Sequence, residues 1–76
     1  VLNRAVASIA GNPLLLNNRA MHLNAMGRRR DALNDFGAAL RADPNYVPAL
    51  TNRAYVQLQG GAAAAAETDL SAAIAL

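Results

Sequence analysis

One short stretch of this 76-residue chain, Leu16-Asn17-Asn18-Arg19-Ala20, returns 34 residues later as Leu50-Thr51-Asn52-Arg53-Ala54. The same register continues with further identities, which pair Gly27 with Gly61, Ala32 with Ala66, Asp35 with Asp69, and Ala38-Ala39 with Ala72-Ala73. Across residues 12–42 and 46–76, nine of 31 aligned pairs are identical without a gap. Self-similarity at a period of a few tens of residues is the signature of a repeat architecture. The sequence therefore predicts two copies of one structural unit.

Each unit has the start and stop signals of two helices joined by a glycine turn. Asn12-Pro13 supplies an N-cap followed by a first-turn proline, and apolar residues then recur at helical spacing as far as Gly27. A second apolar stripe ends at Asp43-Pro44, because proline cannot continue the backbone hydrogen-bond ladder. The first unit is therefore expected to be a helix, a turn and a second helix.

The second unit repeats these signals, with Pro48 in a first turn and Gly60-Gly61 as the break. Residues 1–10 align with the second helix of a unit, since Ala5 and Val6 lie 34 positions before Ala39 and Leu40. We expect helices over residues 14–26, 29–42, 47–59 and 62–75, preceded by one over residues 1–10.

The chain resembles the tetratricopeptide repeat family, whose units have this length and the pattern W-x2-L-G-x2-Y, A-x3-F, P. In the first unit the pattern falls on Leu16, Arg19, Ala20, Leu23, Ala32, Phe36 and Pro44. In the second unit it falls on Leu50, Arg53, Ala54, Gln57, Ala66 and Leu70. The resemblance implies an all-α fold of helix-turn-helix repeats stacked as a short right-handed α-solenoid. It also implies one domain over residues 1–76, with a truncated repeat at 1–10, one repeat at 13–46 and an incomplete one at 47–76.

Small residues are expected where the two helices of each unit cross. Ala20 should pack against Ala32, and Ala54 against Ala66, because alanine lets two helix backbones approach closely. Fewer than about three stacked units is usually marginal for stability. We therefore expect a segment of a longer array, or a chain that associates with itself through terminal helices bearing apolar residues such as Ile74 and Leu76.

The resemblance also implies a binding surface, because the first helices of tetratricopeptide repeats line a concave groove that receives a peptide of another protein. In this sequence the groove candidates are Asn17, Asn18, Met21, Asn24 and Ala25 from the first unit, and Thr51, Asn52, Tyr55, Leu58 and Gln59 from the second. Amide side chains both donate and accept hydrogen bonds, as a peptide backbone requires. The alternative is that Asn18 and Asn52 only hydrogen-bond a neighbouring helix and the other polar residues are solvated.

Composition argues against several other classes of function. The chain has no cysteine and one histidine, His22, so neither a thiolate site nor a multi-histidine metal site is available within it. We expect no enzyme activity, no metal and no cofactor. No apolar run approaches the length of a membrane span. A soluble protein is therefore expected, with the cytoplasm favoured as its location.

Nucleic acid is not the expected partner, although the net charge is +2 and every basic residue apart from His22 is arginine. Only Arg28-Arg29-Arg30 are clustered, and Asp31 follows them at once. We interpret this cluster as a solvated turn in which Asp31 and Asp35 pair with nearby arginines, the alternative being a phosphate or acidic-peptide site.

Two functions follow from the sequence. The first is a protein-protein interaction scaffold that binds a peptide or a partner domain on the face of the first helices. The alternative is a structural spacer or self-association module of a larger protein.

Overall fold

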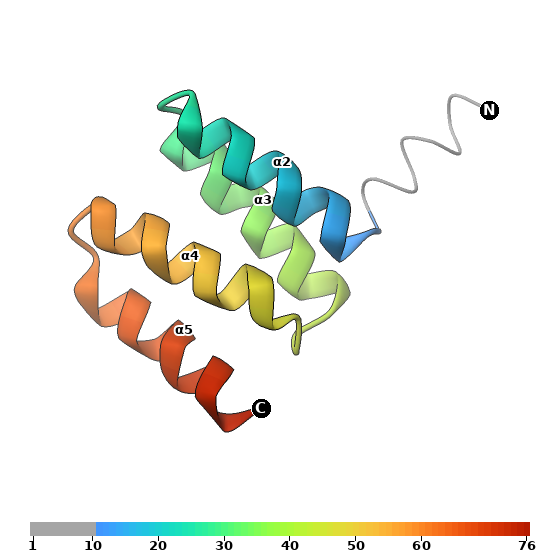
Figure 1. Cartoon of the computed structure of the whole chain (residues 1–76), viewed down its shortest axis with the longest axis vertical. Helices are drawn as coiled ribbons and strands as arrows, with labels where there is room; N and C mark the ends of the chain where they lie inside the picture. Colours follow the sequence, from blue (N-terminus) through green and yellow to red (C-terminus); the bar gives the residue numbers. More distant parts are fainter. Residues whose placement is uncertain (1–10) are drawn as a thin grey trace.

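Four α-helices make up the computed structural model over residues 11–76, the part of the chain that it describes (Figure 1). They are α2 (Pro13–Ala25), α3 (Arg29–Ala42), α4 (Val47–Gln59) and α5 (Ala63–Ala75). The all-α prediction is confirmed. The helix expected over residues 1–10 lies outside the described residues. The ranges expected for α3 and α4 match. α2 both begins and ends one residue earlier than predicted, and α5 begins one residue later.

The glycine turns have the same geometry in both units. Gly27 and Gly61 have φ angles of 80° and 83°, the left-handed region that a residue with a Cβ rarely adopts. In the first turn the Gly27 amide donates to the carbonyl of Asn24, and the next amide donates to the carbonyl of Leu23. The amides of Gly61 and Ala62 repeat both bonds. Both first helices therefore end in a Schellman motif, which satisfies carbonyl groups that the helix leaves unpaired.

Prolines and a capping asparagine set the other helix boundaries. The Asn12 side chain accepts a hydrogen bond of 3.2 Å from the amide of Leu15, and Pro13 occupies the first helical position. This explains why α2 begins at Pro13, since a first-turn proline lacks an N–H that the helix would not use. Asp43 caps the turn before α4 through a 3.0 Å bond from the amide of Asn45 to its carboxylate.

The helices form two antiparallel hairpins, α2 with α3 and α4 with α5. The hairpins meet through α4, which packs against both α3 and α2 (Figure 1). Figure 1 places α5 at the opposite edge of the molecule from α2. The first helices of the two units are consequently neighbours, and α5 packs mainly on α4.

The core is built from small residues at the helix crossings and one aromatic ring. Its buried cluster consists of Leu16, Ala20, Ala32, Phe36, Ala39, Ala49 and Val56. Ala20, Ala32, Ala54 and Ala66 are all buried, as their positions in the repeat predict. Ala49 and Val56 come from α4 but complete the cluster of the first hairpin, so the second hairpin contributes directly to the core of the first.

Replacing Ala32 with leucine should lower the thermal midpoint, because the larger side chain has no space at a fully buried helix crossing. Overpacking of this kind typically costs about 1 to 3 kcal/mol. Ala63→Leu is the matched control, since Ala63 is exposed at the start of α5. Thermal unfolding followed by circular dichroism measures both variants. Equal shifts would contradict the proposed repeat register.

Candidate functional site

The neighbouring faces of α2 and α4 carry a row of paired amide side chains. Asn17 of α2 is buried, and its Oδ1 accepts a 3.1 Å hydrogen bond from Nδ2 of Asn52, which is half-buried on α4. The two residues are 35 positions apart, one more than the repeat period. This bond joins the first helices of the two units.

A second amide pair lies two helical turns further along the same faces. Nδ2 of Asn24 donates to Oε1 of Gln59 at 3.0 Å, and Nε2 of Gln59 lies 3.3 Å from the Tyr55 hydroxyl oxygen. Asn24 and Gln59 each follow their counterpart in the first pair by seven residues. Because a helix repeats its face about every 3.6 residues, both pairs lie on one surface. We call Asn17, Asn24, Asn52 and Gln59 the amide row.

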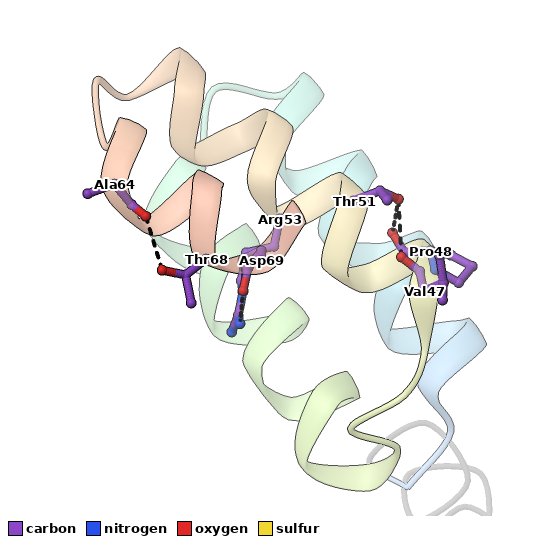
Figure 2. Close-up of polar contacts among 7 residues, drawn as sticks. All are labelled: Val47, Pro48, Thr51, Arg53, Ala64, Thr68 and Asp69. Carbon is purple, nitrogen blue, oxygen red and sulfur yellow. Dashed lines mark hydrogen bonds and ion pairs between the residues drawn. The ribbon is translucent and has the colours of Figure 1, made fainter. Parts of the chain in front are cut away.

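The remaining candidates divide into those beside the row and those directed elsewhere. Tyr55, Leu58 and Ala25 are exposed on the same two helices. Asn18 is exposed and does not join the row, whereas half-buried Met21 packs against the core. The Thr51 hydroxyl lies 3.1 Å from the carbonyl oxygens of both Val47 and Pro48, so it bonds its own helix (Figure 2).

The pairs in the row leave hydrogen-bonding capacity unused. A primary amide has two N–H donors and an oxygen with two lone pairs, and one amide-amide bond uses a single donor on one side. Both N–H groups of Asn17, the second N–H of Asn52 and the Oδ1 atoms of Asn24 and Asn52 take no part in the contacts within residues 11–76. The row therefore offers both donors and acceptors to a ligand, without a charged group among its members.

An arginine-carboxylate pair that the sequence pattern did not predict connects the two helices of each hairpin. Nε and Nη2 of Arg53 donate to the Asp69 carboxylate at 2.6 and 2.7 Å (Figure 2). The equivalent bonds from Arg19 to Asp35 are 2.6 and 3.0 Å. Hydrogen bonds to the carboxylate raise the pKa of each arginine above its ordinary value, against an opposing contribution from burial. Arg19 and Arg53 are thus engaged away from the amide row.

The clustered arginines are also partly engaged within the molecule. Arg28 forms a 2.6 Å ion pair with Asp31, as expected, whereas Asp35 pairs with Arg19 and not with the cluster. Nη2 of Arg29 is 3.5 Å from the carbonyl oxygen of Gln59, at the C-terminal end of α4 where the helix dipole favours a cation.

A shallow hollow of about 350 Å³ lies against the first hairpin. The two arginines that line it, Arg19 and Arg28, are already paired with acids. Its lining consists of Arg19, Leu23, Arg28, Asp31, Asn34 and Asp35. No cluster of histidine and acidic side chains within residues 11–76 could hold a metal ion. None of the helices in this range is long and apolar enough to cross a membrane.

Comparisons with known proteins find no match for this chain among protein-family models, curated proteins or solved structures.

Removing the Asp69 carboxylate should destabilise the protein more than removing that of Asp35. The side chains of Arg53 and Asp69 are 27% and 6% exposed, against 53% and 13% for Arg19 and Asp35. Asp69→Ala leaves a partly buried guanidinium without its acceptors, which we expect to cost on the order of 1 to 3 kcal/mol. Asp35→Ala leaves a more hydrated arginine and should cost at most about 1 kcal/mol. Urea unfolding measures the free energy of unfolding of the two variants. A larger loss of stability for Asp35→Ala than for Asp69→Ala would contradict the prediction.

Proposed function

We propose that this chain is a protein-interaction module of the tetratricopeptide type, which binds an extended peptide segment of a partner protein along the surface shared by α2 and α4. The observation that carries the proposal is the amide row, which places neutral hydrogen-bonding groups from both units on one surface. The proposed chemistry is binding alone, without a reaction.

Recurrence of the same contacts in both hairpins supports a repeat of this type. The Schellman turns recur at Gly27 and Gly61, and the bidentate ion pair of Arg19 recurs at Arg53. These features depend on local geometry as well as on residue type. Their recurrence favours two copies of one helix-turn-helix unit over four unrelated helices.

The spacing of the amide row suits an extended peptide. The two pairs are seven residues apart on each helix, or about 10 Å at 1.5 Å per residue. An extended chain advances about 3.3 Å per residue, so about three peptide residues span the same distance. A peptide lying along the row can therefore present backbone groups to both pairs, while exposed Tyr55 and Leu58 contact its side chains.

The absence of charge in the row favours a neutral or apolar peptide segment over an acidic one. None of the ten candidate side chains on the first helices is an aspartate, glutamate, lysine, arginine or histidine. Affinity should therefore depend weakly on salt. An anion bound at Arg28-Arg29-Arg30 would compete with Asp31 and with the carbonyl of Gln59, and its affinity would fall steeply with salt.

Selection from a random peptide display library, followed by fluorescence anisotropy of the selected peptide, tests this function. Replacing both Asn52 and Gln59 with alanine should weaken peptide binding by on the order of 1 to 3 kcal/mol, because backbone groups of the bound peptide lose their hydrogen-bond partners. Circular dichroism checks that the variant keeps its helices.

Arg30→Gln is the control, since Arg30 is exposed at the turn and lies on α3, away from the row. It should leave the affinity nearly unchanged, as should a rise in salt. The proposal fails if neutralising Arg28, Arg29 and Arg30 abolishes binding while the double amide variant binds like the original chain.

A further inference from the structure

The two hairpins differ in burial at the outer side of their second helices. Phe36 of α3 is fully buried, whereas Leu70, which occupies the equivalent position on α5, is 39% exposed. Ala39 is buried and its equivalent Ala73 is half-buried; Leu40 is half-buried and its equivalent Ile74 is 85% exposed. Positions facing the partner helix within each hairpin show no such difference, because Ala54 and Ala66 are as buried as Ala20 and Ala32.

The cause of this difference is visible within the chain. α3 is covered by α4, whose Ala49 and Val56 belong to one buried cluster with Phe36 and Ala39. Among residues 11–76 no helix occupies the equivalent place beside α5, which lies at the edge of the molecule (Figure 1). We call Leu70, Ala73 and Ile74 the open face of α5. The α3–α4 junction shows which kind of helix fits it, namely the first helix of a further unit.

The chain itself supplies such a helix in α2. The residues of α2 equivalent to Ala49, Asn52 and Val56 are Leu15, Asn18 and His22, and all three are exposed, with Leu15 at 40%. We call them the outer face of α2. The two helices that carry these faces, α2 and α5, lie at opposite edges of the molecule (Figure 1).

The sizes of the opposing residues are complementary. In the α3–α4 junction a large residue of α3, Phe36, and a small residue of α4, Ala49, belong to one buried cluster. In the equivalent contact between two molecules, their places are taken by the smaller Leu70 and the larger Leu15. The loss of volume on one side is offset by a gain on the other, and volume-conserving exchanges of this kind are tolerated in packed interfaces. Neither face carries an acid, an arginine or a lysine.

We propose that the open face of α5 binds the outer face of α2 in a second copy of the chain, reproducing between molecules the α3–α4 junction within one molecule. The contact is heterologous, because two different surfaces meet, and each added copy leaves the same two faces free at the ends. Association is consequently head to tail and does not stop at a dimer. This inference does not depend on the proposed peptide binding.

Sedimentation velocity over a concentration series tests the proposal. The weight-average mass of the original chain should rise continuously with concentration beyond that of a dimer. Ile74→Asp and Leu15→Asp should each abolish this rise, because each places a charge in an apolar contact. The decisive measurement is the mixture of the two variants. Each retains the face that the other has lost, so the mixture should form a one-to-one dimer and nothing larger.

Neighbouring residues provide matched controls. Ala75→Asp and Leu14→Asp introduce the same charge next to the test positions, but their equivalents in the α3–α4 junction, Arg41 and Pro48, remain exposed. Both controls should associate like the original chain. Circular dichroism establishes that each variant is folded.

Disulfide trapping gives a second measurement that does not need a charged substitution. The chain has no cysteine, so Leu15→Cys and Ile74→Cys each introduce a single thiol. Under mild oxidation the mixture of these variants should yield more cross-linked dimer than either variant alone.

Three outcomes would overturn the proposal. A concentration-independent monomer would show that the open face of α5 needs no partner. A dimer that survives Leu15→Asp but not Ile74→Asp would indicate symmetric pairing of α5 with α5. Association that disappears when residues 1–10 are deleted, with α2 intact, would assign the contact to that segment.

Discussion

The close approach of helices at alanine pairs is the constraint on which the other contacts of this protein depend. Ala20 and Ala32 are fully buried in one hairpin, and Ala54 and Ala66 nearly so in the other, so both units have their smallest buried side chains at equivalent places, where alanine permits a close approach of the two backbones. That spacing lets an arginine on the first helix reach an aspartate on the second with two hydrogen bonds, in both units. Polar and apolar contacts therefore repeat together, as properties of one geometry.

The fold could be predicted because its determinants are local. Prolines, two glycines and alanines at a fixed period mark where helices begin, turn and cross, and the bounds of α3 and α4 follow directly. The partners in the site could not be predicted as fully. Asn52 bonds Asn17 at a separation of 35 residues because neighbouring first helices are offset by one position, and this offset depends on how α2 and α4 cross. Asp35 likewise lies near the arginine cluster in sequence, but the folded hairpin brings it to Arg19.

The two interpretations of the amide residues are compatible at Asn52. Its Nδ2 bonds the neighbouring first helix, the alternative role to ligand binding, while its Oδ1 is not used by that bond. A primary amide has enough donors and acceptors to serve both purposes. The internal bond then fixes the side-chain rotamer, so that less conformational entropy is lost when a peptide binds.

The two units are not equally well satisfied at the position that Leu23 occupies in the first. Gln57 stands there in the second unit, and its buried Oε1 has no hydrogen-bond partner in the described part of the chain.

Differences between equivalent residues of the two units limit how far a peptide site could extend across associated copies of the chain. In the proposed head-to-tail contact, the position of the Asn17–Asn52 bond would be taken by Thr51 of one copy and Asn18 of the next. Thr51 already donates its hydroxyl to its own helix, and the Asn24–Gln59 bond would be replaced by Leu58 facing Ala25. The amide row would therefore be interrupted at every junction between molecules. Each copy would present a separate short site, so association would change the number of sites that a partner can engage at once and would leave the affinity of each site unchanged.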